Sequence, residues 1–206
     1  MKKILLIILF CLTVPFAFSG TVKFSSDSMS GSANSENAVT ELLGNAVVTT
    51  DDIKIESGSI KLYGKSFTSI TATENVSGES IKNKFAFSAD TLKYNREKKV
   101  SEFFGNVKFV DKANDTVITC GYALFNETNE ILIIKFNVSI EQKNTKCTAM
   151  SALYNRKKET VDLLGKPKVI KDDDTFSADR ITINLKTKKI TLQGKVKGDL
   201  TEKDSQ

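Results

Sequence analysis

Residues 87–109 read FSADTLKYNREKKVSEFFGNVKF, and the rest of the chain repeats the pattern of this stretch. Apolar and polar residues alternate in Thr91-Leu92-Lys93-Tyr94, as they do in a strand with one buried face. Asn95 follows, and asparagine tolerates the positive φ of a tight turn. The glycine of Gly105-Asn106-Val107 adds no side chain, so a sheet can bend there. The stretch therefore predicts a strand, a turn, a second strand and a bend.

The pattern recurs about every thirty residues. Equivalent bend positions, separated by 30, 31, 31, 29 and 29 residues, are Gly44, Glu74, Gly105, Phe136, Gly165 and Gly194. Ten residues before each bend stands a turn-forming residue: Asn34, Gly64, Asn95, Asn126, Asn155 and Asn184. The clearest direct echo matches Phe87-Ser88-Ala89-Asp90 with Phe176-Ser177-Ala178-Asp179. A fixed period of this length is typical of repeat architectures.

The repeat predicts an all-β fold. We expect a single repeat-built antiparallel β-jellyroll, shaped as a flattened, groove-like barrel of about six 30-residue units. The domain spans residues 20–198, and residues 199–206 form a disordered, charged tail. Many β-branched residues and only two prolines agree with strands.

The first residues predict export. Lys2 and Lys3 precede an apolar stretch from Ile4 to Phe18, and Ala17-Phe18-Ser19 has small residues where a signal peptidase reads them. The stretch is shorter than the roughly 20 apolar residues of a spanning helix. We therefore expect residues 1–19 to be a cleaved signal peptide and the mature chain to be periplasmic.

Composition argues against several classes of function. Without residues 1–19, 28 basic residues stand against 25 acidic ones, and a net charge of +3 is too mild to indicate nucleic acid as a partner. The chain has no histidine, so we expect no enzyme, no catalytic residue and no cofactor. The run Asp172 to Asp174 lacks the spacing of a calcium loop, so no metal is expected. Cys120 and Cys147 stand two positions out of line in the repeat register, which favours free thiols.

Apolar side chains that share the repeat register predict one continuous interior groove. The residues expected to line it are Leu42, Tyr63, Val76, Leu92, Tyr94, Phe103, Val107, Phe109, Phe125, Ile134, Val138, Tyr154, Leu163, Ile183, Leu192 and Val196. Two interpretations stay open: the groove holds a ligand, or the same side chains fill a dry core.

The hairpin turns carry basic residues in a common register. The candidates are Arg96, Lys98, Arg156, Lys157, Lys158 and Lys188. One interpretation is contact with lipid phosphates or an anionic membrane surface, and the other is that they are ordinary solvated turn residues.

The chain resembles the OstA-like, or LptA-type, family of lipopolysaccharide-transport periplasmic proteins. The shared features are the signal segment, the thirty-residue units, a small residue followed by Asp, and the Gly-Asn-Val-like bends. The family's fold is that of LptA, LptC and the N-terminal part of LptD. The matching bends are Gly44-Asn45-Ala46, Glu74-Asn75-Val76, Gly105-Asn106-Val107 and Phe136-Asn137-Val138. The resemblance covers Val22 to Gly198. It departs from the family pattern at Asn95, Asn126, Asn155 and Asn184, where Asp is usual, and at Lys166 and Lys195, where Asn is usual.

The resemblance implies a lipid carrier. We expect a periplasmic bridge protein that shields the acyl chains of lipopolysaccharide, or a related envelope glycolipid, between the inner and outer membranes. Its expected partners are inner-membrane and outer-membrane transport proteins of the same fold, joined by edge-strand addition, and further copies of itself joined head to tail. We expect the edges near Thr40 to Thr49 and Thr182 to Leu192. One alternative is a structural β-repeat scaffold without lipid, and another is a carbohydrate-binding module, which the absence of tryptophan disfavours.

Overall fold

The structure is a computed structural model that describes residues 21–31, 38–64, 66–112 and 115–201. The expected signal peptide and Asn34 lie outside these residues. As predicted, the fold is all-β: the described residues form 16 strands in one antiparallel sheet that does not close on itself. The described part of the chain contains no helix with the length and hydropathy needed to span a bilayer.

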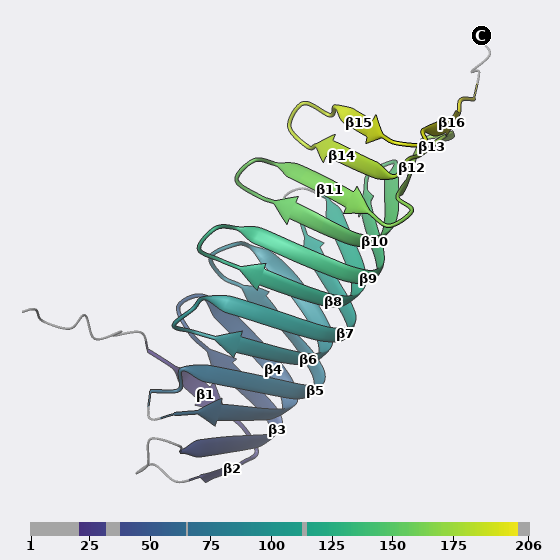
Figure 1. The fold of residues 1–206 in the computed structure, drawn as a ribbon. Helices are drawn as coiled ribbons and strands as arrows, with labels where there is room; N and C mark the ends of the chain where they lie inside the picture. Colours follow the sequence, from purple (N-terminus) through teal and green to yellow (C-terminus); the bar gives the residue numbers. More distant parts are fainter. Residues whose placement is uncertain (1–20, 32–37, 65, 113–114, 202–206) are drawn as a thin grey trace, which may run out of the picture.

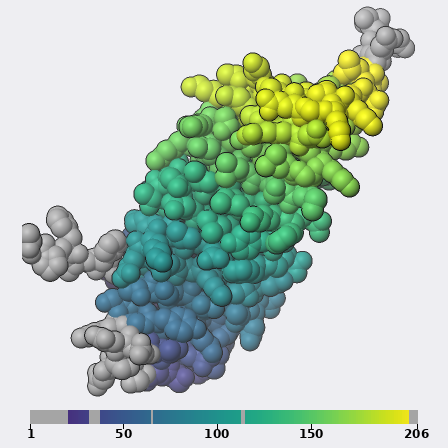
Figure 2. Space-filling view, in the orientation of Figure 1, coloured from purple at the N-terminus to yellow at the C-terminus, as the bar shows by residue number. Residues whose placement is uncertain are grey.

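Eight long strands of 11 or 12 residues form the body of the sheet (Figure 1). They are β3 (Val39–Thr49), β4 (Ile53–Tyr63), β5 (Ser69–Ser80), β6 (Phe85–Asn95), β7 (Val100–Asp111), β8 (Thr116–Asn126), β9 (Ile131–Gln142) and β10 (Thr145–Asn155). Short strands flank them: β1 (Lys23–Ser25), β2 (Ser28–Gly31), β11 (Thr160–Leu164), β12 (Lys168–Lys171), β13 (Asp174–Ser177), β14 (Arg180–Asn184), β15 (Ile190–Gln193) and β16 (Lys197–Asp199). The elements follow one another along the molecule in sequence order (Figure 2).

The long strands bend near the middle, so the sheet folds into two facing layers. Between β7 and β8 the register shifts between Phe104 and Val107, which divides each strand into two halves. Layer 1 contains the strand halves next to the turns at 96–99, 127–130 and 156–159. Layer 2 contains the halves next to the turns at 81–84 and 143–144. Aromatic contacts join the layers, for example Phe87 to Phe103 with ring centroids 5.1 Å apart.

The short strands extend each layer separately. Strands β2, β11, β14 and β15 continue layer 1, and β1, β12, β13 and β16 continue layer 2. The described edges are therefore β1 and β2 at one end and β15 and β16 at the other. The segment from Thr40 to Thr49, predicted to lie close to an edge, is next to the edge strands, because β1 and β2 both pair with β3. At the other end, Thr182 to Leu192 includes most of the edge strand β15.

All six predicted bend positions have a positive φ, and at Gly105 two observations favour glycine. Gly105 has a φ of 68°, in the left-handed region that favours glycine. A Cβ atom at Gly105 would also lie 2.1 Å from Oδ2 of Asp90 on the neighbouring strand. Asn106 Nδ2 donates hydrogen bonds of 3.0 and 3.1 Å to the two Asp90 carboxylate oxygens. The motif of a small residue followed by Asp thus supplies the partner of the next bend.

Two bends lack glycine at the predicted position and have it on the neighbouring strand instead. Glu74 and Phe136 adopt φ values of 69° and 66°. Gly58 faces Glu74, and a Cβ atom there would lie 2.9 Å from the Glu74 Cβ. Gly121 faces Phe136 at 3.0 Å in the same sense. At these bends the neighbouring strand therefore supplies the glycine that makes room for the larger residue.

The core lies between the two layers. In the N-terminal half it is filled by aliphatic side chains that are at most 1% exposed, among them Leu42, Ile55, Ile60, Leu62, Ile70 and Leu92. Further along, Phe85, Phe103 and Phe109 form edge-to-face contacts with centroids 4.9 to 5.6 Å apart. Cys120 and Cys147 are buried and unpaired, as expected, and burial raises the pKa of both thiols to about 11.

Strand pairing continues past the predicted domain boundary at residue 198. Asp199, the last residue of β16, pairs with Thr175. The Thr201 amide then donates a 3.0 Å hydrogen bond to Asp174 Oδ1. The described contacts therefore extend to Thr201, and residues 202–206 lie outside the described residues.

Candidate binding cleft

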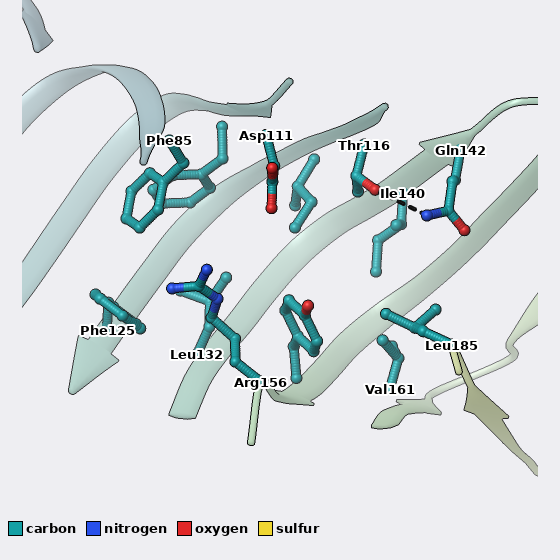
Figure 3. A pocket seen from close by; sticks show the side chains of 13 residues that line it. Phe85, Asp111, Thr116, Phe125, Leu132, Ile140, Gln142, Arg156, Val161 and Leu185 are labelled. Atoms are coloured by element: carbon teal, nitrogen blue, oxygen red, sulfur yellow. Dashed lines mark hydrogen bonds between the residues drawn. The ribbon is translucent and has the colours of Figure 1, made fainter. Parts of the chain in front are cut away.

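An apolar cleft opens between the two layers in the C-terminal half, on the side away from the bends (Figure 3). Layer 2 lines it with Phe85, Phe109, Ile118 and Ile140, and layer 1 lines it with Phe125, Leu132, Tyr154, Val161 and Leu185. Its cavity volume is about 60 Å³. Small-molecule sites are typically concave and mostly apolar. The cleft has the lining of a site for an apolar ligand.

The rim of the cleft is polar because it is formed by residues at the ends of strands. Asp111, Thr116, Gln142 and Arg156 lie along it. Gln142 Nε2 donates a 3.3 Å hydrogen bond to Thr116 Oγ1, which is the contact drawn in Figure 3. A ligand in this cleft would therefore meet apolar side chains inside and polar groups at the mouth.

A second cleft adjoins the first towards the C-terminal end. It shares Ile140, Gln142, Val161 and Leu185 with the first and adds Thr145, Cys147, Ile183, Lys188 and Ile190. Its cavity volume is about 70 Å³. Together the two clefts extend the hollow part of the interior along the C-terminal half.

Polar side chains bridge the same open side in the N-terminal half. Lys99 Nζ lies 3.4 Å from Asp52 Oδ2, and the Tyr94 hydroxyl donates a 3.5 Å hydrogen bond to that oxygen. Glu127 is 4% exposed, and its Oε2 has no hydrogen-bond partner among the described residues. Burial, and then the negative charge of Asp52, raise the pKa of Glu127 to about 7. These side chains therefore connect the two layers on the open side of the N-terminal half.

Most of the predicted groove residues are buried between the layers, but few of them line the clefts. Twelve of the sixteen belong to the buried core: Leu42, Val76, Leu92, Tyr94, Phe103, Val107, Phe109, Phe125, Ile134, Val138, Leu163 and Ile183. Tyr154 and Leu192 pack against that core. Only Phe109, Phe125, Tyr154 and Ile183 border the two clefts.

Two predicted groove residues, Tyr63 and Val196, lie outside the interior. Leu62 is fully buried, and consecutive residues of a strand point to opposite faces, so Tyr63 faces outward. Five residues separate Tyr63 from β5, whereas four separate β6 from β7, so counting back from the bend shifted the register by one. Val196 is 56% exposed because it lies beside the short edge strand β16.

The sequence prediction missed much of the cleft wall. Ile118, Leu132, Ile140 and Val161 line the cleft but were not predicted. Leu132 and Val161 each stand two residues before a predicted residue, and Ile140 stands two residues after Val138. Extending the period-two alternation to the ends of each strand would have found them.

The predicted basic residues have different surroundings. Arg156 borders the first cleft and Lys188 the second. Arg96 Nη1 donates to the Ser66 carbonyl at 2.9 Å, and Lys157 Nζ donates to the Thr128 carbonyl at 3.2 Å. Lys98 and Lys158 are exposed in their turns. No group of three or more His, Cys, Asp or Glu residues is placed to hold a metal ion in the described part of the chain.

Comparison with known proteins identifies a family that matches this chain. The family described as LptA/(LptD N-terminal domain) LPS transport protein matches residues 86–189, just over half of the chain. All residues lining the first cleft except Phe85 fall inside that range.

Among solved structures, the chain is similar to LptH, the LptA homologous periplasmic component of the conserved lipopolysaccharide transport device from Pseudomonas aeruginosa. The two are 13% identical, the alignment covers 88% of this chain and 96% of that chain, and the TM-score is 0.28. No curated protein matches the chain. On the strength of the family match, this chain belongs to the LptA/LptD N-terminal-domain family of LPS transport proteins.

Proposed function

We propose that this chain is a periplasmic lipid-binding bridge protein that shields the acyl chains of lipopolysaccharide, or a related envelope glycolipid, on the way from the inner to the outer membrane. The observation that supports this most is the apolar cleft with a polar rim, which lies within the part of the chain that matches the transport family.

The physical basis of shielding is the cost of exposing hydrocarbon to water. Each buried methylene contributes about 0.8 kcal/mol, so a lipid with several acyl chains cannot cross an aqueous compartment unprotected. In the cleft, side chains such as Leu132 and Val161 cover the acyl chain, and sugars and phosphates stay at the rim in water. Transport then needs no covalent chemistry, only movement of the lipid from one such site to the next.

The unpaired edge strands give the protein a way to join others. Among the described residues, β1 and β2 at one end and β15 and β16 at the other have one side without a neighbouring strand, where a further strand can add. A partner that continues both layers, whether a transport protein of either membrane or a second copy of this chain, extends the interior past one molecule.

Site-specific photo-crosslinking tests the proposal. A photoreactive amino acid replaces Leu132 in the cleft wall and, as the matched control, Leu153, which is 39% exposed on the neighbouring strand. In cells that make lipopolysaccharide, we expect lipid adducts at position 132 and few at 153. Equal labelling at both positions, or none at 132 in a folded protein, would contradict lipid carriage.

A structural scaffold without lipid is the second candidate, and the closely packed N-terminal half favours it. Leu42, Ile60 and Leu62 are fully buried, as in an ordinary protein core. A scaffold would give no lipid adducts at position 132 and would still assemble through its edges, so the same crosslinking experiment separates the two functions.

A further inference from the structure

Arg156 connects the two layers across the mouth of the cleft. It follows β10 in layer 1, and its Nη1 donates a 2.8 Å hydrogen bond to Oδ1 of Asn83, in the turn before β6 of layer 2. Its Nη2 donates a weaker one, 3.3 Å, to the Asn83 carbonyl. The two residues are 73 positions apart in the chain, so this contact exists only when the layers face each other.

The acceptor on the far side is held in place. The Asn83 side-chain amide donates a 3.0 Å hydrogen bond to Ser80 Oγ, and the Asn83 backbone amide points to the same oxygen at 3.3 Å. This leaves the carbonyl end of the side chain directed at Arg156. Asn83 is therefore a fixed, neutral partner for a charged group.

Arg156 combines an apolar setting with a charge that no carboxylate compensates directly. Its guanidinium lies over the Phe85 ring, 5.9 Å from the centroid, and both residues line the cleft. None of the ion pairs in the described part of the chain includes Arg156. The guanidinium thus lies where the apolar wall ends and the polar rim begins.

We infer that Arg156 is a latch that selects anionic lipids: it leaves Asn83 and binds the phosphate or carboxylate headgroup of the lipid whose acyl chain fills the cleft. This rests on the proposed function. An anionic headgroup adds a full negative charge opposite the guanidinium, which the Asn83 amide lacks, and guanidinium binds phosphate with two parallel hydrogen bonds. Arg156 therefore leaves Asn83 only when an anionic headgroup is present to bind it.

Asp111 carries a charge opposite to that of Arg156 at the same cleft. Its carboxylate lines the same cleft and disfavours an anion at the mouth. The latch model therefore predicts opposite effects for the two charges. Neutralising Arg156 weakens the binding of an anionic lipid, and Asp111→Asn strengthens it.

Two amphiphiles with the same chain length test the inference. Calorimetric titrations of the full mature chain with dodecyl phosphate and with dodecyl maltoside, both below their micelle concentrations, compare headgroups at constant hydrocarbon. We expect the wild type to prefer dodecyl phosphate about tenfold and Arg156→Gln to lose that preference, the scale of one charged hydrogen-bond contact. Asn83→Ala should tighten the binding of dodecyl phosphate and change that of dodecyl maltoside little, because Asn83 no longer competes with the anionic headgroup for the guanidinium.

Three controls make the outcomes distinct. Lys157→Gln removes a cation from the same turn without touching the cleft and should leave both affinities unchanged. Arg156→Lys keeps the charge and should retain part of the preference, which covers the case of a poorly folded Arg156→Gln. Thermal melts of each variant establish that it is folded.

The results separate this inference from the proposed function. If the wild type binds neither amphiphile, the proposed function fails. If it binds both equally, or if the preference survives in Arg156→Gln, the latch is overturned and lipid carriage stands. Inorganic phosphate that binds as tightly as dodecyl phosphate would overturn the lipid headgroup as the ligand and indicate a free-phosphate site.

Discussion

Glu127 shows how one side chain near the open side can affect the stability of the whole fold. It lies in the turn after β8, where charged residues are usually solvated, yet it is 4% exposed. Burial has the largest effect on its pKa. Smaller effects come from the charges of Asp52, Lys99 and Lys82 and from Tyr94. The buried carboxyl is therefore easier to accommodate when it is protonated.

The first prediction concerns the pH dependence of unfolding. The pKa of Glu127 rises from its ordinary value of 4.5 to about 7 on folding. The contribution of Glu127 to the free energy of unfolding is fully present below about pH 4.5 and is lost as the pH rises through about 7. The free energy of unfolding then falls by up to about 3 kcal/mol. Glu127→Gln should therefore be more stable than the wild type at pH 8, with little difference at pH 4.

Urea denaturation at several pH values measures this difference. Glu97→Gln is the control, because it removes the same charge from an exposed position in an equivalent turn. If the free energies of unfolding of the wild type and of Glu127→Gln differ by the same amount at every pH from 4 to 8, the raised pKa of Glu127 is refuted.

The surroundings of single residues explain why the sequence could not distinguish Arg156 from the other cations of the turns. The basic register grouped six cations in the turns, and they differ only in what faces them. The Arg156 contact with Asn83 bridges 73 residues, and nothing in a local pattern reports such a distance. Once the layers are folded together, Arg156 is distinct from Lys98 and Lys158, which are exposed.

At the scale of the strand, the bend is the element that determines the architecture. The second prediction is that Gly105→Ala destabilises the protein by about 2 kcal/mol or more. The alanine would occupy a left-handed φ, at a cost of about 1–2 kcal/mol, and its Cβ would collide with Asp90. The midpoint of urea unfolding measures the loss.

A double-mutant comparison separates the two causes. Removing the carboxylate in Asp90→Ala/Gly105→Ala should recover the part of the loss that comes from collision and leave the backbone part. Gly198→Ala, in β16 and without a positive φ, serves as the control and should change stability little. Equal losses for Gly105→Ala and Gly198→Ala would mean that the bend does not require glycine.

Strand-level features were the most accessible from sequence. Period-two alternation predicted strands throughout, and Gly105-Asn106 predicted a bend where one is found. The roles of Gly58 and Gly121 were not predicted, because a glycine that faces Glu74 or Phe136 becomes meaningful only when strand pairing is known. Likewise, one extra residue in the turn after Tyr63 was enough to place that side chain on the wrong face.

At the scale of the whole molecule, the third prediction concerns association through the edges. If β15 of one copy adds to β2 of the next, the assembly can grow without closing. We expect the light-scattering mass of the purified chain to rise with concentration. A lysine on an edge strand disfavours pairing, so Met29→Lys and Thr191→Lys should each keep the protein monomeric.

The control for this experiment is Leu153→Lys, which adds the same charge to the exposed outer face of β10, away from both edges. It should associate like the wild type. Association that survives Met29→Lys and Thr191→Lys together would mean that the contact does not use these edges.

The uneven filling of the interior is a whole-molecule property that the sequence did not disclose. The register predicted apolar side chains along the entire length, and twelve of the sixteen are buried. Whether they leave space depends on how side chains from both layers meet, which a one-dimensional pattern does not contain. The hollow part lies where Ile118, Leu132 and Val161 face one another, and the filled part is where Leu42, Ile60 and Leu62 do.

The order of pairing in the sheet bears on how the molecule forms. Each described strand bonds to strands that are at most three elements away in sequence, and the colours in Figure 2 run along the body without mixing. Nearest-neighbour contacts of this kind make folding a stepwise extension from one hairpin to the next. A chain that leaves the ribosome, first residue foremost, can thus add hairpins in the order of their arrival, before its last strands are available.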